Sequence, residues 1–492
     1  MEAMGAMARK KVSLASLLSL LSLSSLGLLG CSHFRASYDT APNGLVRAEY
    51  NFRRYLEAGR ADSALLQLTQ PMKKSQLPGD ALLRLLFEGV AAHYSGNYER
   101  SASAFDRAAL TAEDRTTKSI SRAAASMIVN DLSLAYEPSP TEQLMLPYFA
   151  ALTYAHAGRY MDAAVEARRL SALLQSLADD DDSSDKRLHA FFRYFAGAVF
   201  DAAGEHADAD VAYRNAWALD SMALPERDTL RTDSTAEIVL VVEHGFVPHR
   251  VQESLLVLLP DAETHEFEDH AEDSRRATAA RIAERVINFA SSSGPRSGSP
   301  RSRTLWVPAP SDAKASRSEV RCDSAGKCRD EHEDHSYLLR MSWPVMYAPA
   351  TPTRTFRFVV DSTAVAAGMS ADISSSVLSD FQREQPAIVA RTIARAATKY
   401  LATKSAEKSA GKKHQALGDV VGAVANITAA LTEQADTRSW HLLPGSLTLL
   451  RTRVPAGQHQ LRLDCSAGAP IELGTVVLRP GQLVVLSKRV WE

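Results

Sequence analysis

The sequence predicts a multidomain protein, an α-helical repeat array followed by a mixed α/β domain that ends in an antiparallel β-hairpin module. Residues 44–222 are rich in Ala, Leu and Arg, and their helical periodicity is broken by glycines. A β-branched run, Glu237–Glu243, then changes the pattern to that of a buried strand. At 492 residues the chain also exceeds what one hydrophobic core usually organises, so we expect two or three domains.

The beginning of the chain has the form of a lipoprotein signal peptide. Basic residues at 9–11 precede an apolar stretch that ends in Leu28-Leu29-Gly30-Cys31, a small residue before a cysteine. We predict a signal peptide over 1–30, lipidation of Cys31 and a tether over 31–43. More than one acyl chain would hold the anchor, since each buried CH₂ contributes about 0.8 kcal/mol. An uncleaved membrane helix is disfavoured because serines dilute the apolar run.

Three segments of the helical region align on one another. In each, a small residue allows two helices to approach, a glycine makes the turn, and an aromatic or small residue fills the seam, which is the logic of tetratricopeptide arrays. The segments contain Gly89, Gly96, Tyr98, Phe105 and Ala108; Ala151, Tyr154, Gly158, Tyr160, Ala163 and Ala167; and Gly197, Phe200, Gly204, Ala209, Tyr213 and Ala216. A weaker copy has its turn at Gly59. We therefore predict irregular tetratricopeptide-like repeats over 44–222.

The α+β domain is predicted over 223–492. Residues 291–336 are dense in Ser, Gly, Pro and Arg and read as a flexible insertion. Besides Glu237–Glu243, strands are predicted at 254–259, 337–343, 355–361, 446–453, 459–464, 475–478 and 483–490, and helices at 271–290, 386–401 and 414–431. The turn Val454–Gly457 predicts a hairpin between the strands on either side of it.

Charge and cysteine content limit the partners. The chain has 56 Lys plus Arg against 58 Asp plus Glu, so nothing indicates a nucleic-acid partner or an acidic bilayer surface. We expect membrane contact through the N-terminal lipid. Cys322 and Cys328 flank five residues and form a candidate local disulfide in an oxidising compartment, the alternative being two free thiols. The pairing state of Cys465 is left open.

The sequence gives little indication of a metal site or of a basic binding surface. The acidic run at 179–185 lacks the glycine and distal glutamate of a calcium loop, and the cluster His332, Asp334 and His335 lacks the helical spacing of a zinc protease, so we predict no metal. In the helix after Pro386, one face is apolar, and a second carries Arg391, Arg395 and Lys399. We interpret the basic stripe as a solvated helix face.

Asp436, Arg438 and Trp440 stand at alternating positions just before the terminal strands. If this stretch is extended, these residues share a face. Asp436 and Arg438 would then pair while Trp440 packs beneath them and locks helix to sheet. We favour that structural role over a ligand site.

Several short sequence segments resemble those of a family of bacterial outer-membrane lipoproteins with tetratricopeptide-like repeats. They are Val129-Asn130-Asp131 with Tyr136-Glu137, Val165-Glu166-Ala167-Arg168-Arg169, Val242-Glu243-His244-Gly245-Phe246-Val247-Pro248, and Glu433 to Trp440 before Leu443-Pro444. The resemblance implies an envelope protein and supplies no established reaction.

No nucleophile elbow, Walker loop or dinucleotide-binding glycine pattern stands where it would matter, so we predict no catalytic residues and no cofactor. The leading hypothesis is a periplasm-facing, outer-membrane-anchored scaffold for another envelope protein. The alternative is an enzyme that binds or hydrolyses an envelope polymer through its C-terminal domain.

Overall fold

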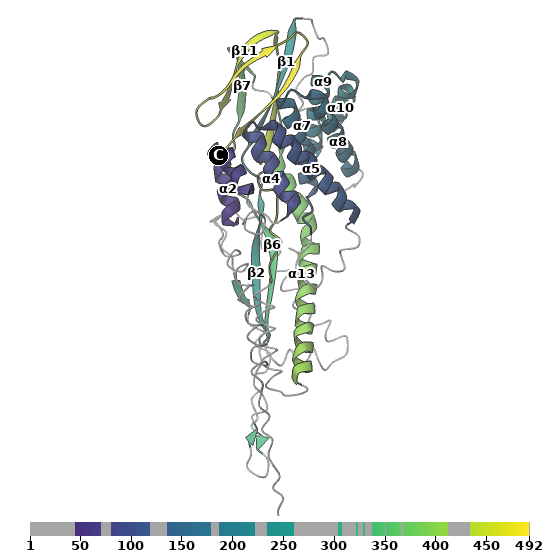
Figure 1. Ribbon diagram of the computed structural model, residues 1–492, viewed down its shortest axis with the longest axis vertical. Coiled ribbons are helices and arrows are strands. Elements are labelled where there is room, and N and C mark those ends of the chain that lie inside the picture. The colour runs from purple at the N-terminus through teal and green to yellow at the C-terminus, as the bar shows by residue number, and fades with distance from the viewer. Residues whose placement is uncertain are drawn as a thin grey trace, which may run out of the picture.

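Helices occupy most of the N-terminal half of the chain, and sheets with mainly antiparallel strands follow (Figure 1). The computed structural model describes residues 45–69, 80–118, 135–178, 186–221, 234–259, 304–307, 321–322, 328–329, 337–349, 351–365, 368–411 and 433–491. The predicted signal peptide, the tether, Cys31, the acidic run and the His332 cluster lie outside these residues. Within them, no helix is long and apolar enough to cross a membrane.

The N-terminal helices form four pairs, each joined by a tight turn. The pairs are α2 (Arg47–Glu57) with α3 (Ala61–Leu68), α4 (Ala81–Tyr94) with α5 (Tyr98–Lys118), α7 (Pro140–His156) with α8 (Tyr160–Ala178), and α9 (Lys186–Ala202) with α10 (His206–Leu219). The four predicted turn glycines are confirmed: Gly59, Gly96, Gly158 and Gly204 have φ of 68°, 77°, 73° and 81°. Such left-handed backbone favours glycine at helix C-termini.

Two other glycines allow the helices of a pair to approach closely. A Cβ added to Gly89 on α4 would lie 2.4 Å from the ring of Phe105 on α5. A Cβ added to Gly197 on α9 would lie 2.9 Å from the ring of Tyr213 on α10. Both aromatic rings are buried, so the glycines make room for the seam between the two helices.

Two four-stranded sheets pack face to face. The first has the order β13-β1-β10-β9, with β1 parallel to β13 and antiparallel to β10, and the second has the order β12-β11-β7-β8. The strands are β1 (Thr235–His244), β7 (Phe356–Val360), β8 (Thr363–Val365), β9 (Gly368–Asp372), β10 (Ser446–Pro455), β11 (Gly457–Cys465), β12 (Ile471–Leu478) and β13 (Leu483–Val490). Ile238, Leu240 and Val242 of β1 point into the core between the sheets.

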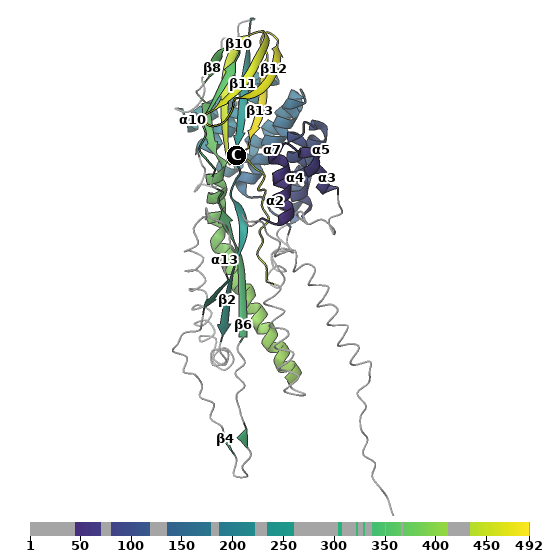
Figure 2. The same cartoon turned by 90° about the vertical axis from the view of Figure 1, so that its left-hand side faces the viewer.

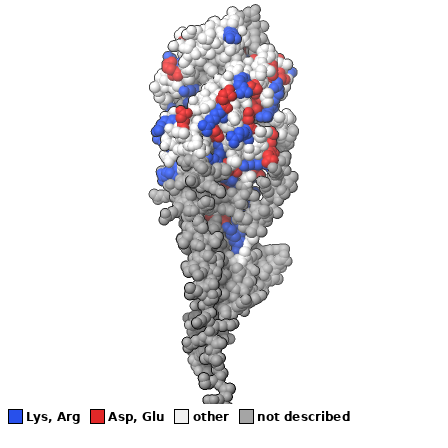
Figure 3. Space-filling view, in the orientation of Figure 1, with Lys and Arg blue, Asp and Glu red and all other residues white. Residues whose placement is uncertain are grey.

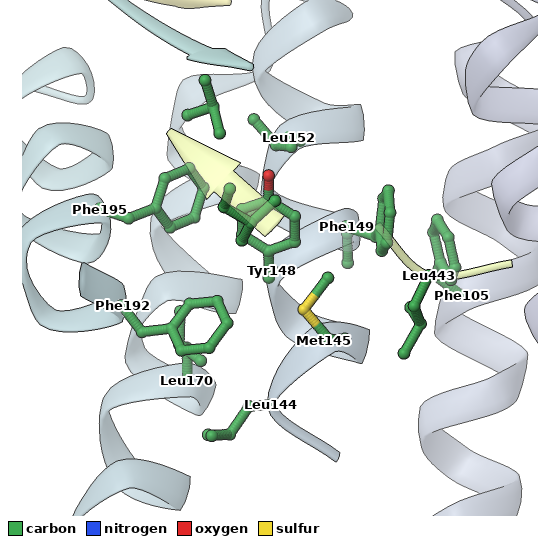
Figure 4. Packing of buried hydrophobic residues seen from close by; sticks show 14 of the residues in the cluster. Phe105, Leu144, Met145, Tyr148, Phe149, Leu152, Leu170, Phe192, Phe195 and Leu443 are labelled. Atoms are coloured by element: carbon green, nitrogen blue, oxygen red, sulfur yellow. The ribbon is translucent and has the colours of Figure 1, made fainter. Parts of the chain in front are cut away.

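The opposite face of the first sheet packs against the helices. Val239 and Val241 of β1 belong to the same buried cluster as the residues of α7 and α9, and both helices contact β13. Figure 4 shows Leu443, which precedes β10, beside Phe105 in this core. Because both faces of β1 are covered, the strand reads as a continuous apolar run. The predicted helical and α+β regions therefore share one core.

A narrower part of the molecule extends from the helices and the sandwich (Figures 1 and 2). It contains β2 (His249–Leu259), β6 (Tyr337–Tyr347) and α13 (Ile373–Gly411), which we call the stalk. Strand β2 pairs antiparallel with β6 along its length and parallel with β3 (Thr304–Val307). The short strands β4 (Arg321–Cys322) and β5 (Cys328–Arg329) pair within the predicted insertion.

Helix α13 begins earlier than the sequence predicted. The prediction took Pro386 as the start, but the helix begins at Ile373 and continues through this proline. Asp372 supplies the cap, because its Oδ1 accepts the Ser375 N–H at 3.0 Å. A proline has no N–H to donate to the carbonyl one turn back, and for this reason proline is common in the first turn of a helix. The sequence alone therefore suggests that a helix starts at Pro386.

The predicted hairpin across Val454–Gly457 is wrong. Strand β10 pairs with β1 along its whole length and with β9 over Ser446–Leu450, and it does not pair with β11. The chain therefore crosses at this turn to the second sheet, where β11 pairs with β12 and β7. The antiparallel hairpin near the C-terminus is formed by β11 and β12 instead.

Candidate functional site: the junction of helices and sheets

The structure pairs Asp436 with Arg438 in a segment before β10 that has no regular secondary structure, and Trp440, in the same segment, makes separate contacts with the helices. The guanidinium of Arg438 donates Nε–H to Asp436 Oδ1 at 2.8 Å and Nη2–H to Asp436 Oδ2 at 2.6 Å, a bidentate pair. Burial by itself would lower the pKa of Arg438, but the hydrogen bond and charge of Asp436 outweigh it and raise the pKa. The guanidinium thus stays charged in a half-buried place.

Trp440 is fully buried and packs between two helix pairs. Its ring centroid lies 5.9 Å from that of Phe149 on α7 and 6.5 Å from that of Phe105 on α5. Its backbone N–H donates to Glu142 Oε1 at 2.7 Å. Trp440 therefore ties the segment before β10 to two of the helix pairs.

Glu142, at the N-terminus of α7, is the other half of this contact. Its Oε2 accepts hydrogen bonds from the hydroxyl of Tyr136 at 2.6 Å and from the N–H of Ser139 at 2.8 Å. Burial raises the pKa of Glu142, while its hydrogen-bond donors act in the opposite direction. The carboxylate completes a capping box with Ser139 and also holds Trp440.

Asp80 plays a similar part at the N-terminus of α4. Its Oδ1 accepts the N–H of Leu82 at 2.9 Å and Arg115 Nη1 at 3.0 Å, and its Oδ2 lies 3.6 Å from Arg438 Nη1. Helix N-termini carry partial positive charge and favour such carboxylates. One helix cap therefore contacts Arg438 and the other binds the backbone of Trp440, which fits a structural lock.

Sequence reasoning missed a second polar centre around Glu243, at the end of β1. Its side chain accepts hydrogen bonds from Tyr94 at 2.8 Å and Tyr148 at 3.1 Å, and burial raises its pKa. The nearby guanidinium of Arg489 lowers that pKa and bonds to the carbonyl of Gly245. The sign of this centre in the sequence was a charged residue, Glu243, at the end of an apolar strand.

A third centre, also missed, joins β10 to the last helix pair. Arg451 donates to the hydroxyls of Tyr194 at 3.2 Å and Tyr213 at 2.8 Å and forms an ion pair with Glu237. Burial lowers the pKa of Arg451, but the two tyrosines and Glu237 raise it overall. An arginine on the core-facing side of a strand was the signal in the sequence.

The basic stripe of α13 is not a solvated face. Arg395 has a side chain 2% exposed and forms an ion pair with Glu433 at 3.2 Å, and Lys399 pairs with the same carboxylate. Of the three stripe residues, Arg391 is exposed. The opposing apolar face is confirmed, since Val389, Ala396 and Tyr400 are buried in the stalk core. Glu433 precedes Asp436 and belongs to the same segment.

The predicted cysteine sites have different positions. Strands β4 and β5 place Cys322 opposite Cys328. Cys465, at the end of β11, is a partly buried free thiol whose pKa is raised by burial. Among the described residues, no group of three or more His, Cys, Asp or Glu side chains is arranged to hold a metal ion.

The three polar centres have one chemical character in common. In each centre a buried carboxylate is held by hydroxyl, amide or guanidinium donors, at least one of which comes from a distant part of the chain, an arrangement that fixes positions. Comparison with models of known families finds no match, and no curated protein matches the chain.

Proposed function

We propose that this chain is a lipid-anchored protein of the bacterial envelope that acts as a scaffold for another envelope protein. The lipoprotein signal sequence that ends at Cys31 supports the anchor. The segments that resemble the outer-membrane lipoprotein family support a periplasm-facing location. The four glycine-turn helix pairs support a tetratricopeptide-like array, an architecture suited to binding protein partners.

The scaffold would bind through its outer helices. Helix arrays commonly use a concave face, but here α7 and α9 pack on the chain's own sheet. On the other side of the helix layer lie α5, α8 and α10, cross-linked by ion pairs such as Arg168 with Glu205 and Arg159 with Glu99. We call the exposed side chains of α5, α8 and α10 the outer face.

The observation that carries the proposal is the apolar character of this face. Leu110 on α5, Met161 on α8 and Trp217 on α10 are 65%, 62% and 53% exposed, and Val165 on α8 and Val211 on α10 are 45% and 47% exposed. Figure 3 shows Lys and Arg interspersed with Asp and Glu over the helices. Exposed tryptophan and methionine side chains are enriched at protein contact sites.

The pocket at the edge of the sandwich is small for a substrate of the enzyme alternative. This pocket is lined by Thr235, Glu237, Arg453 and Gln482 and has a volume of about 10 Å³, room for about one water molecule. Small-molecule sites occupy about 300 to 1,000 Å³. This pocket therefore gives the enzyme alternative no support.

A crosslinking pull-down from membranes tests the proposal. The native chain is compared with Cys31→Ala and with the double variant Met161→Ser, Trp217→Ser, and the captured proteins are read by mass spectrometry. We expect one envelope protein with the native chain and a loss of roughly tenfold or more with either variant. Val477→Ser, which changes an exposed apolar residue on β12, is the matched control and should capture as much as the native chain. Equal capture by all variants would refute the outer face as the binding site.

A further inference from the structure

The short strands β4 and β5 bring two cysteines opposite each other. Cys322 pairs with Cys328, and Arg321 pairs with Arg329, in an antiparallel ladder. Figure 2 shows β4 beyond the labelled parts of β2 and β6 along the long axis of the molecule. The two cysteines thus belong to a small hairpin remote from the N-terminal helices and the sandwich.

We propose that Cys322 and Cys328 form a disulfide that closes this hairpin. Directly opposite residues of an antiparallel pair have Cα atoms about 4.5 to 5.5 Å apart. That interval lies inside the range of about 4.4 to 6.8 Å that a disulfide needs. The backbone register therefore supplies the placement that the spacing in the sequence left open.

The hairpin has a physical need for a covalent link. Its ladder is two residues long on each strand, and isolated two-stranded hairpins are at best marginally stable in water. Arg321 is paired with Arg329, and like charges at directly opposite positions destabilise a strand pair. A bond between the adjacent cysteines would keep the strands paired against both effects.

Formation of the bond balances as a thiol–disulfide exchange. The thiolate of one cysteine attacks a disulfide of a second protein, and the thiolate of the other then resolves the mixed disulfide. This protein loses two electrons and two thiol protons, and the second protein leaves as a dithiol. The inference rests on the proposed envelope location, because disulfides persist in that compartment.

Cys465 provides an internal control. It lies on β11 in the sandwich, which Figure 2 shows at the end of the molecule opposite β4. Its thiol is partly buried, so the structure separates it from the hairpin cysteines in both position and surroundings. We expect it to stay reduced.

Tryptic mapping of the full chain purified from membranes tests the bond. Trypsin cuts after Arg321, Lys327 and Arg329, so the disulfide would join peptides 322–327 and 328–329. Thiols are blocked with a maleimide under denaturing, non-reducing conditions before digestion. We expect the joined peptides, separated by reduction, and maleimide on Cys465. A bond from either cysteine to Cys465 would overturn the proposal. Maleimide on Cys322 and Cys328 would overturn it too, unless the oxidised preparation described next shows the joined peptides.

One further preparation separates this inference from the proposed location. The chain lacking 1–30 is made in a reducing cytoplasm and then oxidised with glutathione disulfide. Joined peptides there, with free thiols in the membrane preparation, would support the pairing and count against the envelope location. Free thiols in both would overturn the pairing itself. Cys465→Ser should leave the joined peptides unchanged, whereas Cys322→Ser should expose one additional labelled thiol, on Cys328.

Discussion

Buried carboxylates set the contacts between distant parts of this chain. Glu142, Glu243 and Glu433 are buried, and each has at least two donors. An isolated buried charge costs several kcal/mol, so such a group persists where its partners are fixed. Removal of one member of a buried donor–acceptor pair leaves the other member without a partner. This lowers stability more than removal of both members does.

A pair of histidines predicts how stability depends on pH. Nε2 of His156 accepts the N–H of Ser487 at 3.1 Å, which requires a neutral ring and ties α7 to β13. Burial lowers the pKa of His156 to about 4, and burial followed by the charge of His156 lowers that of His93. Both rings are therefore neutral in the folded protein near neutral pH.

We expect His156 to make the protein less stable as the pH falls from about 6.5 to 4, because the unfolded state then binds a proton that the folded state does not. The loss amounts to about 2 kcal/mol by pH 5. Urea unfolding at pH 7.5 and pH 5 measures it. His156→Gln should reduce the difference between the two pH values by about this amount, and an unchanged difference would contradict the assignment.

In the same urea experiment, Glu166→Gln should change the pH dependence of stability in the opposite direction to His156→Gln. Burial raises the pKa of Glu166 to about 7, so its contribution is present at low pH and lost as the pH rises from about 4.5 to 7. Glu166→Gln should therefore steepen the loss of stability on acidification, whereas His156→Gln flattens it.

At the scale of the elements, the helix pairs depend on close approach. We expect Gly89→Ala to destabilise the protein by about 1 to 3 kcal/mol, because the new Cβ would lie 2.4 Å from the buried ring of Phe105. Thermal unfolding measures the loss. In a double-mutant cycle, Phe105→Leu should relieve part of the clash, so the two changes should combine to less than their sum. Additive effects would show that the seam adjusts freely.

Helix α13 allows a test in which the variant is the more stable protein. Because Pro386 is exposed inside a continuous helix, Pro386→Ala should raise the free energy of unfolding by about 1 to 3 kcal/mol. As a matched control, Ala390→Gly, also exposed, should lower it by about 1 kcal/mol. If the helix began at residue 386, the proline would be favourable there and its replacement would bring no gain.

Local sequence patterns predicted the helices and strands better than they predicted which of them pair or pack together. The turn glycines and most strands could be predicted because they depend on neighbouring residues, and the Asp436–Arg438 pair spans two positions. Tyr94 and Glu243 are 149 residues apart, and no local pattern joins them. The crossing from one sheet to the other after β10 also has no local signal, because the partners of β10 and β11 lie far away in the sequence: β1 pairs with β10, and β7 pairs with β11.

At the scale of the whole molecule, the helices and the first sheet form one unit. Tyr148 shows why: its ring packs against Phe192 and Phe195 of α9, and its hydroxyl donates to Glu243 on β1. Glu142 and Trp440 make a second such link, and Arg451 with Tyr213 a third. A helical fragment would expose this apolar face to water and leave these donors without acceptors.

We therefore expect a fragment of residues 45–221 not to fold alone, although the sequence assigns it a separate domain. In the complete chain, hydrogen exchange read by mass spectrometry should show α7, α9, β1 and β10 opening in one cooperative event. The stalk is the internal comparison, since α13 and β6 have a core of their own and can open at lower free energy. A fragment that melts cooperatively at the temperature of the full chain would show that the shared core is a contact between independent domains.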